Sequence, residues 1–125
     1  MKTPKPTEAD PSDRLAALAV AALEALKAID VRVLDVHRLT PLTDYMVICT
    51  GTSSRHVKSM ADKVLEQARQ HGTPARGVEG LSEGEWVLVD LGAVVVHVMQ
   101  AQARAFYQLE KLWDLSETEA RARAS

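Results

Sequence analysis

The sequence predicts an α/β fold, in which a single domain contains a mixed β-sheet flanked by helices. Two observations lead to this prediction. The chain has 125 residues, enough for one core but not for a second folded domain. Its apolar patterns also run in the order helix, two strands, helix, two or three strands, helix. Strands that follow one another closely imply a mixed rather than a purely parallel sheet.

The composition narrows the class of protein and the kinds of partner that it is expected to bind. The chain is 46% hydrophobic and 26% charged, with a formal net charge of −2, which is typical of a globular protein. Such a charge does not attract nucleic acid, so DNA is not an expected partner and bare RNA is a poor one. A lone cysteine, Cys49, excludes an intramolecular disulfide and a cysteine-based zinc site. We expect it to be a buried core thiol.

The ends of the chain differ from its middle. Residues 1–11 contain three prolines among small polar and charged residues, and we expect a mobile arm there. We place the folded domain at residues 12–114 and a polar tail at 115–125. No apolar h-region follows the N-terminal lysines and no apolar run approaches the length of a membrane span. We therefore expect a cytoplasmic protein without a membrane partner.

The first half of the domain contains one helix and two strands. Ser12 or Asp13 is the predicted N-cap of a helix, and apolar residues recur at steps of three and four over residues 15–29. Residues 31–36 are rich in β-branched side chains and predict a short strand. Residues 44–50 are nearly continuously apolar, as expected of a strand covered on both faces.

A second helix follows a turn. The segment Gly51-Thr52-Ser53-Ser54 has turn and capping chemistry. An apolar stripe over residues 57–68 then predicts an amphipathic helix, which Gly72 and Pro74 end.

The last elements are a hairpin and a helix. After a glycine-containing loop, residues 85–99 predict two strands joined by a two-residue turn at Leu91-Gly92. In the final helix we expect the following side chains to face the core: Ala105, Phe106, Leu109, Leu112 and Trp113.

The hairpin predicts two faces of different character. A turn at Leu91-Gly92 pairs Asp90 with Ala93, Leu88 with Val95 and Trp86 with His97, with side chains alternating along each strand. One face consists of valines and needs helices over it: Val87, Val89, Val94, Val96 and Val98. The other face is mixed: Trp86, Leu88, Asp90, Val95, His97 and Met99.

The mixed face has two interpretations. An aromatic anchor beside polar neighbours is typical of an interaction surface. Pattern alone favours a second buried face with a hydrogen-bonded histidine, because Trp and His are often partly buried. A three-residue loop would exchange the pairing and weaken either interpretation.

The turn before the second helix also has two interpretations. Thr52, Ser53, Ser54 and Arg55 place hydroxyls, backbone N–H groups and a basic side chain at a helix start, where anions bind favourably. They are candidate anion-binding residues. Simple helix capping is the more common role of such serines, and pattern alone favours it.

No catalytic or metal site assembles from the sequence, and we expect neither a metal nor a cofactor. The four histidines lie in different elements, and no helical metal pair or phosphate-binding loop motif occurs. Ser53, His97 and Asp90 have no nucleophile signature around them. A nucleotidyltransferase-like enzyme is a sharper alternative, because a Gly-Ser turn follows a strand. Its expected pair of metal-binding aspartates is missing, since Asp90 is followed by Leu91 and Gly92.

Five segments together closely resemble the ribosomal silencing factor family, also called the Iojap family. They are DYMVICTGTSSRHV at residues 44–57, GVEG at 77–80, WVLVDLG at 86–92, VVVHVMQ at 94–100 and FYQLEKLW at 106–113. The resemblance runs from about Leu15 to Trp113, in the family's order.

The resemblance implies a fold related to nucleotidyltransferases without their activity. It implies binding to the large ribosomal subunit through large-subunit ribosomal protein fourteen, which sterically blocks joining of the small subunit when nutrients are scarce. Homodimers are common in this family, which makes a homodimer a candidate assembly. A large-subunit assembly factor is an alternative that shares this partner and differs in timing.

The resemblance also reverses the interpretation of the mixed face. Trp86, Asp90 and the Leu91-Gly92 turn match family positions implicated in docking, so we expect Trp86 as the apolar anchor and Asp90 as a partner for lysine or arginine. His97 is the expected neighbour that fixes the tryptophan. The remaining candidates for partner contact are Leu88, Met99, Tyr107 and Glu110. One departure is Ala93, where the family usually has an acid.

Overall fold

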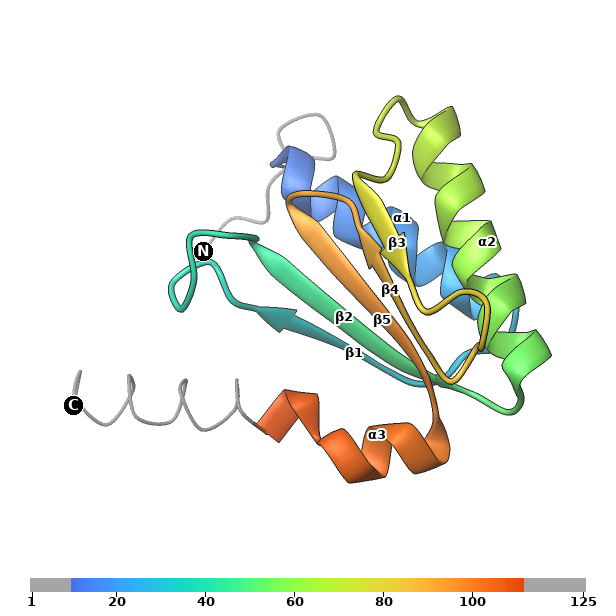
Figure 1. Ribbon diagram of the computed structural model, residues 1–125. Coiled ribbons are helices and arrows are strands. Elements are labelled where there is room, and N and C mark those ends of the chain that lie inside the picture. The colour runs from blue at the N-terminus through green and yellow to red at the C-terminus, as the bar shows by residue number, and fades with distance from the viewer. Residues whose placement is uncertain (1–9, 112–125) are drawn as a thin grey trace.

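The computed structural model describes residues 10–111, which form one α/β domain around a five-stranded mixed sheet (Figure 1). The strand order is β1-β2-β5-β4-β3. Only the central pair of β2 and β5 is parallel. Helices α1 and α2 cover one face of the sheet, and α3 lies on the other side of it. The expected fold class is confirmed, whereas the tail and residues 1–9 of the expected arm lie outside the described residues.

Helix α1 (Pro11–Ala25) begins earlier than predicted. Its N-cap is Asp10, whose Oδ1 accepts hydrogen bonds from the Ser12 backbone N–H at 3.0 Å and from the Ser12 hydroxyl at 2.9 Å. Proline is favoured in the first turn because no backbone partner exists there for the N–H that it lacks. The helix ends at Ala25, so the predicted apolar stripe was too long, and Ile29 begins a strand.

Strands β1 (Ile29–Asp35) and β2 (Tyr45–Gly51) pair in antiparallel fashion. Strand β1 lies at one edge of the sheet and is largely exposed. Its register is irregular beside Asp30, whose φ is 50°. Strand β2 is buried along almost its whole length, which confirms the prediction of a strand covered on both faces.

Helix α2 (Ser54–Gln70) is capped by Ser53, whose hydroxyl oxygen accepts from the His56 N–H at 3.0 Å. Its stripe from Val57 to Ala68 is buried, as predicted. Strand β3 (Gly77–Glu79) lies in the segment predicted as a glycine-containing loop, although the predicted order left a third strand open in this half of the chain. At three residues it is too short to show periodicity, and its pairing with β4 defines it.

Strands β4 (Trp86–Asp90) and β5 (Val94–Gln100) form the predicted hairpin in a different register. Trp86 lies opposite Met99, Leu88 opposite His97 and Asp90 opposite Val95. The Leu91 N–H donates to the Val94 carbonyl at 2.9 Å, so the two-residue turn is Gly92-Ala93, not Leu91-Gly92.

The turn shifts because Gly92 adopts φ +87° at the first loop position, as a type II′ turn requires. Moving the turn by one residue moves the register by two. The two faces of the hairpin therefore keep their predicted members.

Helix α3 (Ala101–Tyr107) corrects the prediction for the last helix. Phe106 is 79% exposed and Ala105 is also exposed, whereas Ala103 and Arg104 are buried. The helix follows β5 without a loop, so only residues 103 and 104 turn toward the sheet. Leu109 is half-buried against a small cluster of Leu34, Val36, Met46 and Ile48. Leu112 and Trp113 lie outside the described residues.

Candidate docking site on the second face of the sheet

The valine face is closed to partners. Val87, Val89, Val94, Val96 and Val98 are completely buried in the core beneath α1 and α2. This confirms that these positions need helices over them. Side chains of the hairpin can therefore reach a partner only from the opposite face.

That opposite face brings the predicted docking residues together. Trp86, Leu88 and Asp90 of β4 alternate with the valines and are all half-buried. His97 and Met99 of β5, only 6% and 1% exposed, lie beside them beneath the surface. The side chains of β4 form the accessible layer, and those of β5 support it.

Trp86 and His97 are joined by a hydrogen bond. The indole Nε1–H donates to His97 Nδ1 at 3.0 Å. Burial lowers the pKa of His97 from 6.5 to about 4, so the ring is neutral near pH 7. Because Nδ1 accepts, the ring proton of the neutral form lies on Nε2. The histidine thus holds the tryptophan ring in one orientation.

The aromatic row continues onto α3. The Tyr107 ring lies 4.7 Å from that of Trp86 between centroids, and Phe106 meets Tyr107 edge-on at 4.9 Å. Phe106 was not among the predicted docking residues, because an apolar residue in a helix was assigned to the core. Its position next to Tyr107 was the available signal.

Asp90 and Leu91, which directly precede the turn, differ in accessibility. Leu91 is 3% exposed and belongs to the core beneath the helices, so its side chain is not available for direct contact with a partner. Asp90 Oδ1 accepts from the Gly92 N–H at 2.8 Å, which fixes the turn. The second carboxylate oxygen gives the half-buried Asp90 a remaining acceptor for a basic partner.

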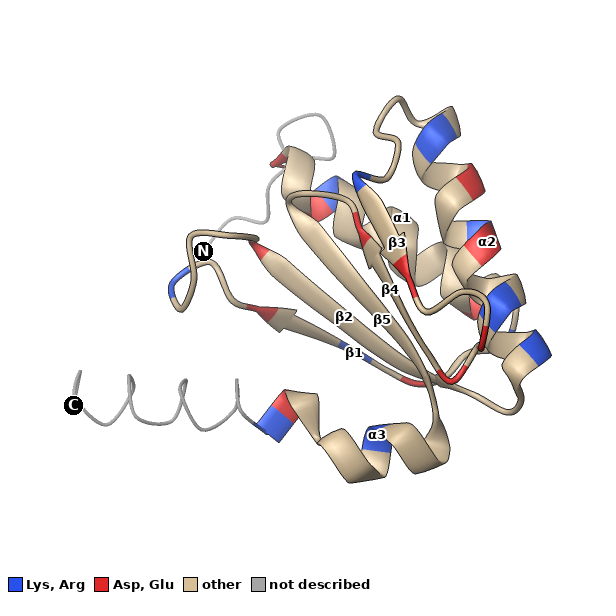
Figure 2. Cartoon of the chain, in the orientation of Figure 1, with Lys and Arg blue, Asp and Glu red and all other residues tan. Residues whose placement is uncertain are grey.

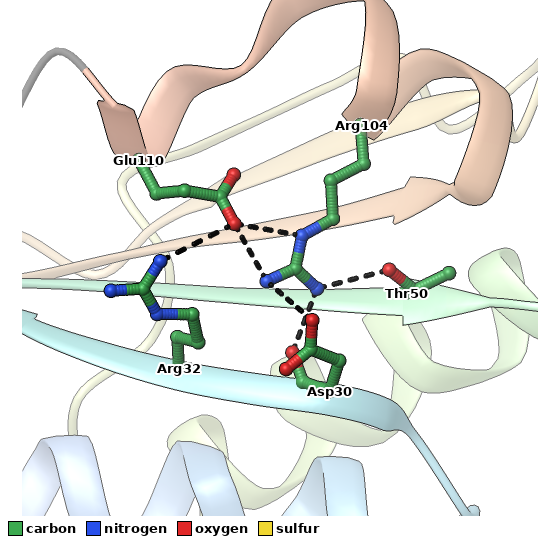
Figure 3. Close-up of polar contacts among 5 residues, drawn as sticks. All are labelled: Asp30, Arg32, Thr50, Arg104 and Glu110. Atoms are coloured by element: carbon green, nitrogen blue, oxygen red, sulfur yellow. Dashed lines mark hydrogen bonds and ion pairs between the residues drawn. The ribbon is translucent and has the colours of Figure 1, made fainter.

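Arg104 joins α3 to the far end of the sheet (Figure 3). Its guanidinium donates to Glu110 Oε2 at 2.9 and 3.1 Å, to the Asp30 carbonyl at 2.7 Å and to the Thr50 hydroxyl at 3.0 Å. Arg104 was not predicted. The only available signal was that no lysine and no other arginine occurs between positions 77 and 110.

Glu110 is part of this network. Burial acts to raise its pKa, but hydrogen bonds from Arg104, together with the charges of Arg104 and Arg32, outweigh burial and hold the pKa below its ordinary value. Arg32 lies 3.7 Å from the same carboxylate oxygen. The structure therefore gives Glu110 a structural role within the chain, and its contact with a partner stays a prediction.

The candidate anion-binding turn is occupied by internal contacts. The Thr52 N–H donates to His56 Nδ1 at 2.9 Å, and the opposite ring nitrogen of His56 lies 2.7 Å from the Leu26 carbonyl. A Cβ on Gly84 would lie 2.7 Å from the Ser54 hydroxyl, so the loop before β4 packs on this turn. These contacts favour capping, and anion binding by Thr52, Ser53, Ser54 and Arg55 stays a prediction.

Two further observations concern metal-binding clusters and membrane-spanning helices. Within residues 10–111, no three His, Cys, Asp or Glu side chains gather as they would to hold a metal ion. Over the same residues, no helix has the length and apolar character needed to cross a bilayer.

Comparison with known proteins identifies close relatives. Residues 9–124 match the family model described as "Ribosomal silencing factor during starvation". The chain is 47% identical over 91 residues to the ribosomal silencing factor of Haemophilus influenzae, covering 73% of this chain and 89% of the relative. It is 42% identical over 96 residues to that of Bacillus subtilis, covering 77% and 81%.

The chain is also similar to a more distant relative and to a protein of known structure. The mouse protein named "Mitochondrial assembly of ribosomal large subunit protein 1" is 34% identical over 113 residues, covering 84% of this chain and 50% of the relative. A crystal structure of a Chromobacterium violaceum protein superposes with a TM-score of 0.82 at 42% identity, covering 84% of this chain and 88% of that one.

Proposed function

Because the chain belongs to the ribosomal silencing factor family, we propose that it represses translation by binding the large ribosomal subunit and blocking joining of the small subunit. The proposed contact on the ribosome is large-subunit ribosomal protein fourteen, and the proposed setting is nutrient limitation. The mechanism is steric and needs no turnover. A bound copy removes large subunits from the joining equilibrium by mass action.

One observation carries the proposed site: the half-buried indole of Trp86 is held at the surface by a hydrogen bond to a buried neutral histidine. Tryptophan and tyrosine are common energetic anchors of interfaces. An anchor that is already oriented loses less entropy on binding. Trp86 beside Tyr107, with Asp90 on the same strand face, is such an anchor.

The proposed docking face is tested with purified large subunits. We expect Trp86→Ala to weaken cosedimentation at least about tenfold, and Asp90→Lys to weaken it through charge reversal. Val95→Lys changes the same face without removing the Asp90 bond to the turn. Circular dichroism establishes that each variant is folded.

Two exposed positions that do not belong to this face provide matched controls. Glu24→Lys on α1 repeats the charge reversal, and Leu42→Ala truncates a side chain that is 83% exposed. If the docking variants bind as tightly as the parent chain, the proposed face is wrong. A parent chain that neither binds large subunits nor lowers the fraction of joined ribosomes contradicts the proposed function itself.

A role in large-subunit assembly is a second candidate, and the name of the mouse relative favours it. Comparing the affinity of the parent chain for immature and mature large subunits separates the two roles. Stronger binding to immature particles supports assembly, and equal or stronger binding to mature particles supports silencing. A homodimer and a cytoplasmic location stay predictions from the resemblance and from the apolar pattern.

The enzymatic alternative makes a different prediction. A nucleotidyltransferase-like reaction through the Gly51 to Arg55 turn needs carboxylates that hold cations, and the acid pair of such enzymes is missing from the sequence. Magnesium-dependent nucleotide transfer that Ser53→Ala abolishes would establish this alternative. We propose that the chain is not an enzyme.

A further inference from the structure

A groove of about 360 Å³ lies beside the aromatic row, outside the proposed docking strand. Helix α3 contributes Gln102, Ala103, Phe106 and Tyr107 to its lining, and the sheet side contributes Glu85 and Gln100. We refer to these six residues as the α3 groove. Aromatic rings thus meet a carboxylate and two amide side chains in one hollow.

The aromatic wall of the α3 groove is exposed to an unusual degree. Phe106 is 79% exposed and Tyr107 is 48% exposed, although the two are neighbours in one short helix. Exposed aromatic residues that adjoin each other mark interaction sites more often than scattered apolar residues do. Tyr107 contacts Trp86, so the groove is continuous with the proposed docking face.

The chain segment that carries Glu85 and Gln100 has acidic residues and no basic ones other than His97. The run from Gly77 to Ala103 contains Glu79, Glu83, Glu85 and Asp90 and no lysine or arginine. Figure 2 shows red without blue on β4, and neither colour on β5. Among residues 10–111, Glu85 is exposed and forms no ion pair.

We infer that the α3 groove receives an arginine side chain of the protein partner, with the guanidinium on the rings of Phe106 and Tyr107 and paired with Glu85. This inference rests on the proposed function and adds a specificity determinant beside the Trp86 face. Guanidinium groups stack on aromatic rings while donating in their own plane to a carboxylate. Lysine supplies a point charge without this planar stacking.

Gln100 fits the same occupant. Its Nε2 donates to the Gly84 carbonyl at 2.9 Å, which leaves the side-chain oxygen as an acceptor. A hollow with an aromatic wall, a free carboxylate and an amide oxygen supplies acceptors and ring faces. A cationic donor complements that set, and an acidic or purely apolar side chain does not.

The first test measures binding of the full chain to purified large subunits at low and high salt. We expect Glu85→Gln to weaken binding by about fivefold at low salt, with the difference vanishing at high salt because ions screen the pair. We expect Phe106→Ala to weaken binding by about tenfold at both. The matched controls Glu24→Gln and Leu42→Ala should bind as the parent does.

The outcomes of this test separate an arginine occupant from an apolar one. Loss with Phe106→Ala alone means an apolar occupant and overturns the inference, as does parent-like binding by both variants. Failure of the parent chain to bind large subunits contradicts the proposed function, and the second test then judges the groove alone.

The second test needs no ribosome. Amide chemical shifts of the full chain are followed by NMR during titration with a hexa-arginine peptide, and in parallel with a hexa-lysine peptide. We expect larger shifts with arginine, concentrated at residues 84–86 and 100–107, and their loss in Glu85→Gln but not in Glu24→Gln. Equal shifts with both peptides, or shifts elsewhere, overturn the preference for arginine.

Discussion

The protonation state of His97 decides whether its ring can hold Trp86 in place on the docking face. Its Nδ1 accepts the Trp86 indole proton at 3.0 Å, and its ring is buried in the sheet. Protonation places a second N–H on the ring where the acceptor was. It therefore removes the Trp86 bond and adds a buried charge.

The pKa of His97 predicts a pH dependence of stability. The pKa is about 4 in the folded protein against 6.5 ordinarily, so between these values the unfolded chain binds more protons. The neutral His97 ring makes its full contribution to the free energy of unfolding above pH 6.5, and this contribution is lost as the pH falls toward 4. We expect a loss of about 2 kcal/mol in the free energy of unfolding from pH 7.5 to pH 5, measured by urea unfolding.

Two variants isolate the His97 contribution. His97→Gln should flatten this part of the pH profile, whereas His71→Gln, at an exposed position, should leave the slope unchanged. The carboxyl groups with lowered pKa values, on Asp10, Asp35 and Glu110, have ordinary values of 3.8 to 4.5 and contribute mainly below this window. An unchanged slope in His97→Gln would contradict the assignment.

At the scale of elements, close backbone contact holds the β3 and β4 hairpin. Gly80 follows β3 with φ +84°, and a Cβ there would lie 2.0 Å from the Trp86 carbonyl oxygen. Gly72 follows α2 with φ +87° and has open space around it. The two glycines share a backbone conformation and differ in their surroundings.

This pair predicts different costs for the same substitution. Gly72→Ala should destabilise the protein by about 1 kcal/mol, because an L residue is strained at positive φ. Gly80→Ala adds a clash with backbone and should cost at least about 2 kcal/mol more. Urea unfolding of both variants measures the difference, and equal costs would contradict the close packing at Gly80.

A second element-scale link is the Arg104 network, which joins α3 to β1 and β2. The side chain of Arg104 is 9% exposed and that of Glu110 is 16% exposed. Removing one member of such a nearly buried pair leaves the other charge without compensation. We expect this network to hold α3 in place, and with it Tyr107 against Trp86.

We therefore expect Arg104→Met to lower the free energy of unfolding by about 3 kcal/mol and to increase hydrogen exchange across residues 101–107. Arg55→Met, at an exposed position of α2, is the matched control and should change neither quantity. Normal exchange protection in Arg104→Met would mean that the contacts of Ala103 and Leu109 suffice to hold the helix.

At the scale of the whole molecule, the parallel pair β2 and β5 forms the centre. Cys49 lies in β2 opposite Val98 and is completely buried. Burial raises the pKa of its thiol to about 12. Thiolate is the reactive form, so modification of this thiol requires the central sheet to open.

Cys49 should therefore report global unfolding. Since it is the chain's one cysteine, we expect labelling by a thiol reagent to be at least about a thousandfold slower in native buffer than in urea. Ser82→Cys, which adds a thiol at an exposed loop position, should label at once. Rapid labelling of Cys49 in the parent chain would show local opening of β2.

The sequence determined the order of the main elements, the valine face and the membership of the opposite face. These follow from local periodicity, because a strand or helix that packs on a core must repeat its apolar residues at its own period. The motif segments further determined the family. The sequence placed the turn one residue too early, which shifted the predicted pairing by two residues. Because side chains alternate with a period of two, Trp86 and His97 were still predicted on the same face.

Tertiary structure alone decided the rest. Local sequence predicts that Arg104 is a surface residue of a short helix. In the structure its guanidinium donates a hydrogen bond to the carbonyl of Asp30, which is 74 positions away. Strand β3 exists only through its pairing with β4, and α3 exposes Phe106 because it leaves the sheet directly at Gln100. Local patterns carry no information about contacts between distant segments, and those contacts set the burial of Arg104 and the shape of the docking face.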